Sequence, residues 1–569
     1  MKDFRLKLQR IARKNYSCYH DLLGGFRIGK SHYNLYFVQP DPFAPPSQME
    51  VVVPFSETGL PTALLTDDLA RTALCDFVHR RIFPAACEQS QKAGPSRSGG
   101  SIGMPKPSQQ ILDRTVVQIR GETVRIRFAL VLPADQRSVA AEAASELLLN
   151  RVPEAVTVGV WWDDKANEEF ALHLRTLRKA RALRAQLEER GLVAFVADGS
   201  PLPRASGVSD EPAAGAVPFE SPERWAVELE AEGERIRGMG IPEGLTLLVG
   251  GAFHGKSTLL RALEQGVYDH VPGDGREFAV ARADAAKIRS EEGRWISGAD
   301  LSLFAHDLPG GKDAADFSTE AASGATSQAA ALVEALECGS RLLLIDEDES
   351  AVNFLFRDER MRALVDASRE SIAPLVDRIS FLKKSGVSVV MVAGAGGDVL
   401  DLADRAIALK EWRCEDVTDE AREVCAKLPA RRGPGSGTAS PELPLPRRAA
   451  LPSWSATVFG KKGEPHAKAV STGLLRLGSF EADLTKLDQL VDRAQTQALG
   501  AAVLWLAQNS EDGETVPELV ARAEERVAKA GLDGLSRRSG AEFARFRPQE
   551  LAAALYRLRR LGMRPGNRG

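Results

Sequence analysis

A glycine-rich segment near the middle of the chain has the residue types and spacing of a phosphate-binding loop. Within "LLVGGAFHGKSTLLRAL", which begins at Leu247, the pattern G-x-x-x-x-G-K-S is formed by Gly250, Gly255, Lys256 and Ser257. Backbone N–H groups of such a loop, with the N-terminus of the following helix, can surround phosphate oxygens. The strand-like "LTLLVGG" before it and the helical "GKSTLLRALEQG" after it make a chance glycine-rich turn a poor explanation.

Two side chains of this loop define its chemistry. Lys256 can reach the β- and γ-phosphates, and the hydroxyl of Ser257 can bind Mg²⁺. We therefore predict that ATP and Mg²⁺ bind here, with His254 as a solvated loop side chain. The predicted nucleotide contacts comprise the whole loop: Gly250, Gly251, Ala252, Phe253, His254, Gly255, Lys256, Ser257 and Thr258.

An acidic pair ends a second apolar stretch, "RLLLIDEDES". Asp346 is predicted to bind Mg²⁺ together with Ser257, and Glu347 to orient or deprotonate the attacking water. Strands often end in acids, so this pattern alone is weak. The phosphate loop upstream in the same domain favours the functional interpretation.

Three further segments distinguish between classes of phosphate-loop proteins. Ser323, in "ASGAT", lies 23 residues before Asp346. The acidic pair is followed by S-A-V-N at residues 350–353 and, later, by "LADRAIALK". In order and spacing these segments resemble the signature, the S-A-L-D segment and the "LADRVVVL" segment of ABC-type ATPases. The resemblance disfavours a GTPase and leaves a P-loop kinase as a weak alternative.

The resemblance also implies roles for the signature. In ABC-type ATPases this segment presents a serine and a helix N-terminus, which is an anion site, to the γ-phosphate held by a partner protomer. Ser323 and Gly324 would have that role here, which places Ser323 with Glu347 and Lys256 among the catalytic residues. One chain has one phosphate loop and one signature, so the resemblance implies a homodimer with two ATP molecules at its interface.

A narrower resemblance covers most of the chain. "YHDLLGG", "DPFAPPS", "ADGSPLPRASGVSD", "GMGIPEG", "YDHVPGDGRE", "FSTEAASGATSQAA" and "LLLIDEDESAVNF" occur in order, within a resemblance that extends from Tyr19 to beyond Gln495. They resemble segments of the soluble predicted ATPases of the ABC class. The implied fold is an α/β P-loop NTPase core of ABC type, flanked by an α+β N-terminal region and a mainly helical C-terminal domain.

Some positions depart from the general ABC pattern. The switch histidine would fall ten residues before Asp404 of "LADR", where this chain has Gly394. Asp300, in "WISGADLSLF", is the candidate substitute for the missing Q-loop glutamine, and Trp225 is the candidate aromatic residue for adenine. Because the histidine senses the γ-phosphate in the family, we expect slow turnover and a protein that acts more as a switch than as a motor.

Composition divides the chain into four parts. Residues 1–215 form the N-terminal region, 216–427 the ATPase core, 428–454 a linker and 455–569 the C-terminal domain. The linker is assigned because it is rich in glycine and proline. Residues 85–110 have a similar composition and are expected to form a flexible basic loop.

Apolar patterns predict the main elements. In the core, "LTLLVGG", "RLLLIDED" and "VSVVMVAG" alternate with helical segments, which predicts a parallel sheet with crossovers. In the N-terminal region, "HYNLYFVQP" and "MEVVVPF" are strand-like, and "RTVVQIRGETVRIRFALVLP" predicts a hairpin around "RGE". A stripe within "LTKLDQLVDRAQTQALGAAVLWLAQ" predicts a helix: Leu484, Leu487, Val491, Ala494 and Ala498.

Length and composition exclude other classes. A chain of 569 residues needs several domains, and 44% apolar with 27% charged residues is ordinary for a globular protein. There is no run of 18 apolar residues and no apolar signal segment, so we expect no membrane span and a cytoplasmic location. The basic, amphipathic first residues leave organellar import open. The six cysteines form no C-x-x-C, which predicts reduced thiols and no zinc site.

Clusters of basic residues suggest a partner for the ATPase. The net charge is −4, so contacts with nucleic acid must come from local patches. We predict binding of RNA or single-stranded DNA through the phosphate backbone. A solvated linker and tail would explain the same charges, and a nucleotide-gated protein scaffold is the alternative function. The patches comprise Lys92, Arg97 and Lys106; Arg431, Arg432, Arg447, Arg448, Lys461, Lys462 and Lys468; and nine arginines from Arg537 to Arg568.

Overall fold

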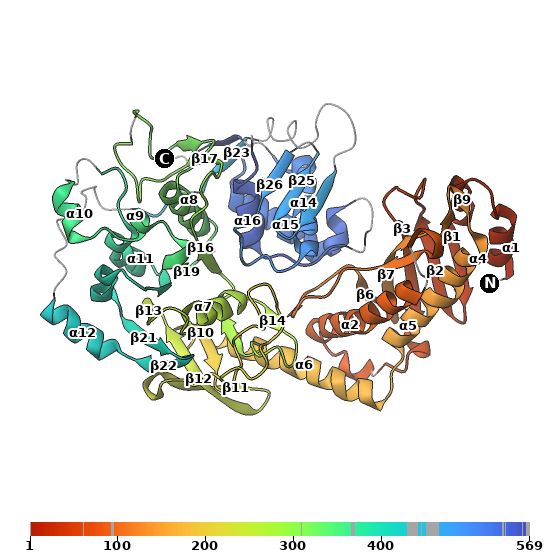
Figure 1. The fold of residues 1–569 in the computed structure, drawn as a ribbon, viewed down its shortest axis with the longest axis horizontal. Coiled ribbons are helices and arrows are strands. Elements are labelled where there is room, and N and C mark those ends of the chain that lie inside the picture. Colours follow the sequence, from red (N-terminus) through yellow and green to blue (C-terminus); the bar gives the residue numbers. More distant parts are fainter. Residues whose placement is uncertain are drawn as a thin grey trace. The chain divides into compact units, whose positions relative to one another are not determined.

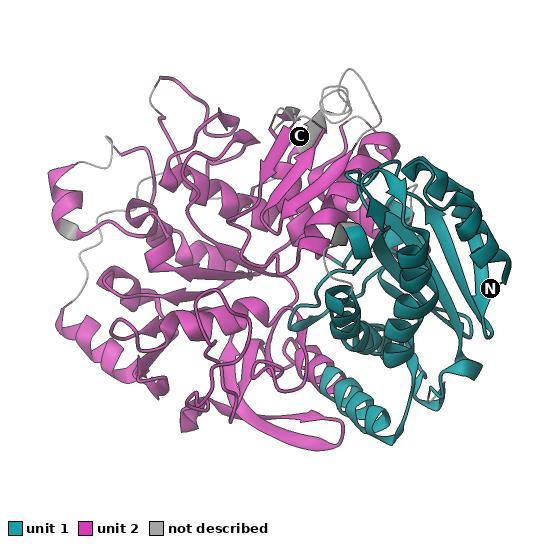
Figure 2. Cartoon of the chain, turned by 45° about the vertical axis from the view of Figure 1, so that its right-hand side comes forward, with its two compact units in different colours: residues 1–177, 530–545 teal, residues 178–529, 546–569 magenta. Residues whose placement is uncertain are grey.

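The computed structural model contains two compact units, shown in Figures 1 and 2. It describes all residues except 1, 61, 93–95, 309, 366–369, 429–441, 445, 451–465, 479, 512, 537–539, 541, 560–561 and 565–569. The first unit comprises Met1–Leu177 and Ala530–Arg545, and the second comprises Arg178–Lys529 and Phe546–Gly569. The division falls within helix α6 (Asp164–Ala185), and β10 (Leu192–Ala197) belongs to the second unit, where it pairs with two other strands.

An antiparallel sheet forms the core of the first unit. Its strands are β1 (Gly24–Ile28), β2 (Ser31–Phe37), β3 (Ser47–Pro54), β7 (Thr123–Val131) and β4 (Ser101–Gly103), in that order, with β6 (Val117–Arg120) also paired to β7. Buried and half-buried residues alternate along β3, which is typical of an antiparallel sheet with one covered face. The hairpin predicted at "RGE" is confirmed: β6 pairs with β7, and Gly121 has a φ of 58° in the turn.

The prediction of a flexible loop over residues 85–110 is wrong for much of that stretch. Helix α2 (Asp68–Lys92) includes residues 85–92 of this stretch, and α3 (Ser96–Gly99) and β4 follow. Ala85 and Ala86 are buried, and the hydroxyl of Ser90 lies 3.1 Å from the carbonyl and 2.9 Å from the N–H of Ile102. These tertiary contacts override the local composition. The unit also contains α1 (Lys2–Ile11), β5 (Gln110–Ile111), β8 (Ala134–Asp135), β9 (Ser138–Val139), α4 (Ala141–Glu146) and α5 (Val152–Val160).

The predicted parallel sheet is confirmed in the second unit. Its order is β16 (Ala285–Ile288), β19 (Leu342–Asp346), β20 (Ser388–Val392), β13 (Leu245–Val249), β21 (Arg405–Lys410) and β22 (Arg413–Asp416), of which β22 is antiparallel. Every residue of β19 and β20 is buried, as expected when helices cover both faces. The carboxyl ends of β13, β20 and β19 therefore lie side by side.

Different helices pack against the parallel sheet. Leu247, Leu343 and Val389 point from alternate strand positions into a core shared with α8 (Gly324–Glu337) and α11 (Ile379–Lys384). Helix α7 (Lys256–Gln265) packs against β19 and β20 and against β15 of a second sheet. That sheet has the order β11 (Ala226–Ala231), β12 (Glu234–Pro242), β10 (Leu192–Ala197) and β15 (Ala279–Ala281).

The C-terminal part of this unit combines helices with a small sheet. Helices α14 (Arg493–Asn509), α15 (Val516–Ala530) and α16 (Pro548–Tyr556) are accompanied by β24 (Ala467–Ser471), β25 (Leu474–Leu477) and β26 (Phe480–Asp483). Helix α14 starts later than predicted, because Asp492 caps it in a capping box with Gln495. Leu484, Leu487 and Val491 consequently precede the helix. The remaining elements are β14 (Asp269–His270), β17 (Ile296–Ala299), β18 (Phe317–Thr319), α9 (Val352–Leu355), α10 (Glu359–Leu364), α12 (Thr418–Lys427), β23 (Arg448–Ala450) and β27 (Gly562–Arg564).

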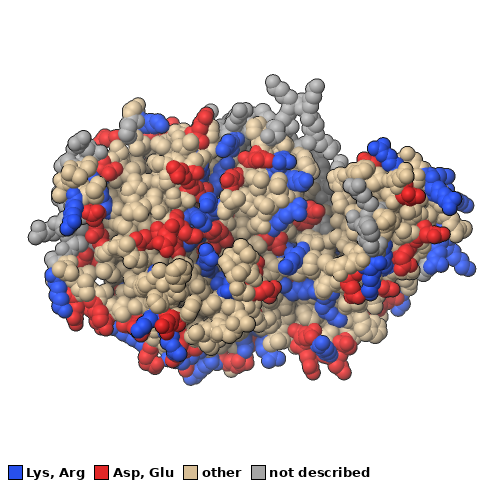
Figure 3. Space-filling model, viewed as in Figure 1, with Lys and Arg blue, Asp and Glu red and all other residues tan. Residues whose placement is uncertain are grey.

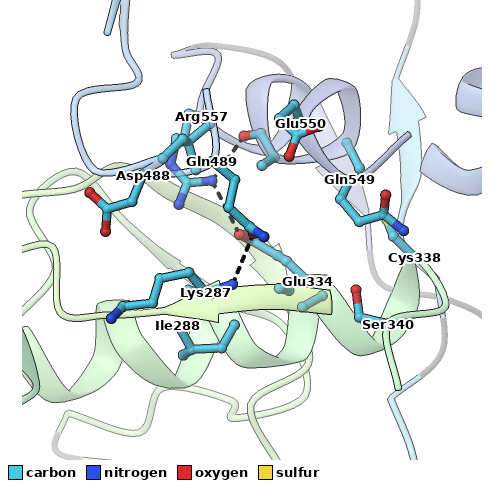
Figure 4. A pocket seen from close by; sticks show the side chains of 16 residues that line it. Lys287, Ile288, Glu334, Cys338, Ser340, Asp488, Gln489, Gln549, Glu550 and Arg557 are labelled. Carbon is cyan, nitrogen blue, oxygen red and sulfur yellow. Dashed lines mark hydrogen bonds and ion pairs between the residues drawn. The ribbon is translucent and has the colours of Figure 1, made fainter. Parts of the chain in front are cut away.

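A buried ionic cluster joins helix α8 to C-terminal residues. The carboxylate of Glu334 lies 2.5 Å from Arg294 and 3.0 Å from Arg447, and Glu337 is 3.3 Å from Arg447. Burial alone would raise the pKa of Glu334, but the neighbouring arginines outweigh it and hold the pKa below its usual range. Figure 4 shows Glu334 and Arg557 at a cavity of about 60 Å³ that Lys287 and Gln489 also line. The interface between the core and the C-terminal segment is thus held by paired charges.

We predict that Glu334→Ala lowers the free energy of unfolding of this unit by about 3–5 kcal/mol, because it leaves buried guanidinium groups uncompensated. Urea unfolding followed by tryptophan fluorescence would measure the change. Glu423→Ala is the control, since Glu423 is exposed on α12 and forms only a surface pair with Lys427. Equal unfolding midpoints for the two variants would contradict the importance of the cluster.

Candidate nucleotide site

The phosphate loop connects β13 to α7, as predicted. Gly250 and Gly255 have φ values of 129° and 103°, which favour glycine, and a Cβ on Gly250 would lie 2.4 Å from the Leu409 carbonyl oxygen. Gly255 is the N-cap of α7 and contributes no side-chain cap. The N–H groups of the first helical turn are therefore directed at the space where an anion would lie. Gly251, Ala252 and Phe253 form the exposed apex of the loop.

The two polar side chains after Gly255 point to different parts of the site. The ammonium group of Lys256 donates to the carbonyl oxygens of Gly250 and Gly251, at 2.8 and 2.7 Å. The hydroxyl of Ser257 donates to the carboxylate of Asp346 at 2.8 Å. The structure thus brings Ser257 and Asp346 together, as predicted from their spacing to the two strands. Thr258 follows in the same helical turn.

The donor set fits ATP with Mg²⁺. Lys256 is buried to 9% exposure, and the hydrogen bonds of its ammonium group are to carbonyl oxygens, for which phosphate oxygens could substitute. Ser257 and Asp346 supply two oxygen ligands, and Mg²⁺ in nucleotide sites takes one or two protein ligands besides phosphates and water. Within the described residues, no group of three histidine, cysteine, aspartate or glutamate side chains could hold a metal ion alone. In a nucleotide complex, Ser257, Asp346 and the phosphates would supply ligands to the ion.

Glu347 lies immediately beyond β19 and is held by the backbone of another loop. Its carboxylate accepts hydrogen bonds from the N–H groups of Gly394, at 2.5 Å, and Ala395, at 3.0 Å. Gly394 is the position at which the ABC pattern places the switch histidine. The structure therefore puts main-chain donors beside Glu347 at the place where the sequence lacks the imidazole.

The signature residues start helix α8. The hydroxyl of Ser323, the N-cap, accepts from the N–H of Thr326 at 3.3 Å, and Gly324 is the first helical residue. The hydrogen bonds described for the Ser323 side chain stay within this helical turn. Gln328 on the same helix bonds the hydroxyl of Ser350 and the N–H of Ala351, each at 2.8 Å. The signature is thus connected to the S-A-V-N segment but not, through these bonds, to the phosphate loop of its own chain.

One expectation about side chains near the loop is wrong, and two others remain predictions. His254 is half-buried, and its Nδ1 accepts from the N–H of Glu411 at 3.0 Å, at an exposed position. Trp225 is only 5% exposed, with the guanidinium of Arg405 over its ring at 5.6 Å, so it offers no open face to adenine. Asp300 is buried and accepts from the N–H of Ser302 at 3.0 Å, which leaves its role in the site a prediction.

Trp412 is an aromatic residue whose place beside the phosphate loop the sequence did not reveal. It is 42% exposed, and a Cβ on Gly255 would lie 2.8 Å from its ring. Trp412 and Glu411 form the two-residue turn between β21 and β22, with φ values of 63° and 50°, although neither is glycine. Such a conformation is costly and is concentrated at functional sites. The hairpin "ALKEWRCED" was a sequence signal for the turn, but not for its approach to the loop.

Comparison with known families agrees with this geometry. Residues 166–440 match the ABC_ATPase P-loop domain, residues 1–160 match the family described as the N-terminal part of ATPases of the ABC class, and residues 466–564 match the MRB1590 C-terminal domain. The fold and the site define a P-loop ATPase domain of the ABC type. The chain belongs to the ATPases of the ABC class, with the N-terminal and C-terminal regions that accompany this P-loop domain.

Individual relatives add less. An uncharacterized protein of Methanocaldococcus jannaschii, MJ1628, is 34% identical over 245 residues, which cover 41% of this chain and 53% of that protein. This chain therefore spans about half the length of that relative. Solved structures include the ADP conformation of MJ1267, an ATP-binding cassette of an ABC transporter (11% identity, 34% of this chain, 89% of that chain, TM-score 0.23). CbiO1 of Clostridium perfringens, part of an ABC transporter complex, has 15% identity, covering 36% of this chain and 93% of that chain, with a TM-score of 0.22. TM-scores this low add nothing to the assignment. No helix in the described part of this chain is long and apolar enough to cross a membrane.

We predict that Lys256→Ala weakens ATP binding at least about 100-fold, because hydrogen bonds to charged groups contribute about 1.5–3 kcal/mol each. Isothermal titration with ATP and Mg²⁺ would measure the affinity. Lys384→Ala is the matched control, since Lys384 is exposed at the end of α11. Undiminished affinity in a folded Lys256→Ala variant would contradict the assignment of the site.

Proposed function

We propose that the protein binds and slowly hydrolyses ATP at a homodimer interface and couples this cycle to nucleic acid. The observation that carries the proposal is the 2.8 Å hydrogen bond from Ser257 to Asp346, which joins the phosphate loop to the acidic pair. Glu347, the next residue, stands beside a site that fits ATP with Mg²⁺. This arrangement suits transfer of a phosphoryl group to water.

The roles of the residues follow from their chemistry. Lys256 would stabilise charge on the β- and γ-phosphates, while Ser257 and Asp346 would hold Mg²⁺, which would neutralise charge on phosphate oxygens. Glu347 orients a water molecule and accepts its proton as the water oxygen bonds to the γ-phosphorus. The bond from that phosphorus to the β–γ bridging oxygen breaks, and the electron pair stays with ADP. Slow turnover is expected because Gly394 offers no side chain to sense the γ-phosphate.

A homodimer would complete this site. Ser323 and Gly324 begin a helix whose N-terminus can bind an anion, but the hydrogen bonds described for Ser323 do not reach the loop of its own chain. Phe253, at the apex of the loop, is 95% exposed, and Val352, in the S-A-V-N segment, is 61% exposed. A second copy that supplied its signature to the phosphates would cover both apolar side chains.

We predict that Glu347→Gln retains ATP and accumulates as a dimer with ATP and Mg²⁺, because binding persists while hydrolysis stops. Size-exclusion chromatography with light scattering would give the mass with and without nucleotide. Glu423→Gln, at an exposed site on α12, should behave as the parent protein. A Glu347→Gln variant that binds ATP but remains a monomer would contradict the dimer.

Several basic residues predicted to contact nucleic acid are engaged in structure instead. Arg447 is fully buried with Glu334 and Glu337, while Arg547 and Arg557 are buried in ion pairs with Glu550 and Glu291. Lys92 is exposed but paired with Glu88 at 2.8 Å. On the face of the molecule in Figure 3, basic and acidic side chains are interspersed over the described residues. Phosphate contacts would thus depend on other positions.

Besides Lys92, three of the predicted basic residues are exposed within the described part of the chain. They are Lys106 in the first unit, Lys468 on β24 and Arg559 after α16. Arg431, Arg432, Lys461 and Lys462 lie outside the described residues, as do Arg537, Arg538, Arg560, Arg568 and the side chains of Arg97, Arg448 and Arg564. The excess of positive charge after residue 430 supports binding of RNA or single-stranded DNA. A nucleotide-gated protein scaffold is the alternative.

We predict that the logarithm of the affinity for single-stranded RNA falls linearly with the logarithm of salt concentration, by about 0.7 per phosphate contact. Changing Arg431, Arg432, Lys461 and Lys462 to glutamine should reduce this slope by up to about 3 and weaken all sequences alike. Fluorescence anisotropy across a salt series would measure it. The control changes Arg422 and Lys427 of α12, which pair with Asp419 and Glu423. No binding at low salt would favour the scaffold.

A further inference from the structure

The loop after β20 meets the residue after β19 because the two strands are parallel neighbours. Asp346 at the end of β19 lies opposite Val392 at the end of β20. Glu347 and the loop of residues 393–397 therefore start side by side. The Gly394 N–H lies 2.5 Å from one carboxylate oxygen of Glu347, and the Ala395 N–H lies 3.0 and 3.2 Å from the two oxygens. Two consecutive main-chain donors thus converge on one carboxylate.

The donor loop is also fixed by packing that does not involve Glu347. A Cβ on Gly396 would lie 2.3 Å from the ring of Phe356, so glycine lets this ring pack on the loop backbone. Phe356 directly follows α9, which starts in the S-A-V-N segment. Ala393, the first residue of the loop, and Val399, beyond its end, are buried. These contacts hold the two N–H groups in position independently of Glu347.

The side-chain position at residue 394 is open. Gly394 is not among the glycines with positive φ, and a Cβ there would meet only the Glu347 carboxylate, at an ordinary contact distance of 3.8 Å. Neither backbone conformation nor lack of space therefore demands glycine. What this loop supplies to Glu347 is its main chain, at the position where the family pattern has an imidazole.

We propose that the peptide N–H groups of Gly394 and Ala395 position Glu347 for hydrolysis, as main-chain substitutes for the switch histidine. This proposal rests on the function proposed above, in which Glu347 accepts the proton of the attacking water. Hydrogen bonds from N–H groups to a carboxylate are charge-assisted and restrict a side chain with three rotatable bonds to one arrangement. A main-chain donor cannot rotate toward the γ-phosphate as a histidine side chain can. The loop therefore orients the base without sensing the nucleotide, which gives slow turnover a physical cause.

Removal of one donor tests the proposal. Ala395→Pro, and an ester variant with lactate in place of Ala395, both lack this N–H, and the ester keeps the freedom of the backbone. We expect each to lower kcat about 10- to 100-fold, the effect of one hydrogen bond to a charged group, while KM for ATP changes less than about 2-fold. Lys384→Ala, at the exposed end of α11, is the control and should retain the parent kcat. Single-turnover hydrolysis and ATP titration would measure the two effects.

A double-mutant cycle separates this role from a structural one. If the N–H acts through Glu347, Ala395→Pro should have no further effect on residual hydrolysis in the Glu347→Gln background. Additive losses would overturn the proposal, as would an unchanged kcat in the ester variant. Gly394→His offers the missing side chain: a large gain in kcat, with no loss in the ester variant, would also overturn it. If Glu347→Gln itself hydrolyses ATP at the parent rate, the proposed function fails first, and the two failures are distinguishable.

Discussion

The hydrogen bond from the hydroxyl of Ser257 to the carboxylate of Asp346 joins the two chain segments on which the nucleotide site depends. It can form because β13, β20 and β19 are parallel neighbours whose carboxyl ends share one edge of the sheet, and every residue of β19 and β20 is buried. Lys256 precedes Ser257, and Glu347 follows Asp346, so both are placed by the same bond. The loop at Gly394 comes from the strand between them. The register of these three strands therefore places Lys256, the two candidate metal ligands, Glu347 and the N–H donors to Glu347 at the same edge of the sheet.

Helix α8 extends this arrangement beyond the nucleotide. Its N-terminus carries Ser323, and one turn further Gln328 bonds Ser350 and Ala351, which follow the acidic pair. Its last turn carries Glu334 and Glu337, held by arginines that include Arg447 from the C-terminal side. Helix α8 is thus fixed at both ends, by hydrogen bonds at its start and by buried ion pairs at its end. Helix α8 therefore connects Arg447, on the C-terminal side, to Ser323, which would face a partner's ATP in the proposed homodimer.

The contrast between predicted and observed features has a physical explanation. The phosphate loop, the acidic pair and their strands could be predicted because their chemistry depends on residues close together in sequence. Arg447, Arg547 and Arg557 belong to the clusters predicted to contact phosphate, yet they pair with carboxylates, three of which are more than 100 residues away. The sequence around these arginines does not indicate a carboxylate that lies so far away in the chain. The same applies to residues 85–92, whose helix is held by contacts that local composition does not contain.

Main-chain chemistry is the least visible from sequence, and the loop at Gly394 illustrates why. Every residue except proline carries an N–H group, so a site built from two of them leaves no characteristic side chain. In the sequence, the absence of histidine at residue 394 suggests that the function of the switch histidine is missing. The geometry indicates a replaced one: the contact with Glu347 is made, but by donors that neither ionise near neutral pH nor change rotamer. In the proposed mechanism, such a loop holds the base in one orientation. In the proposed homodimer, control of hydrolysis would then come from an element that moves, the signature of the second copy.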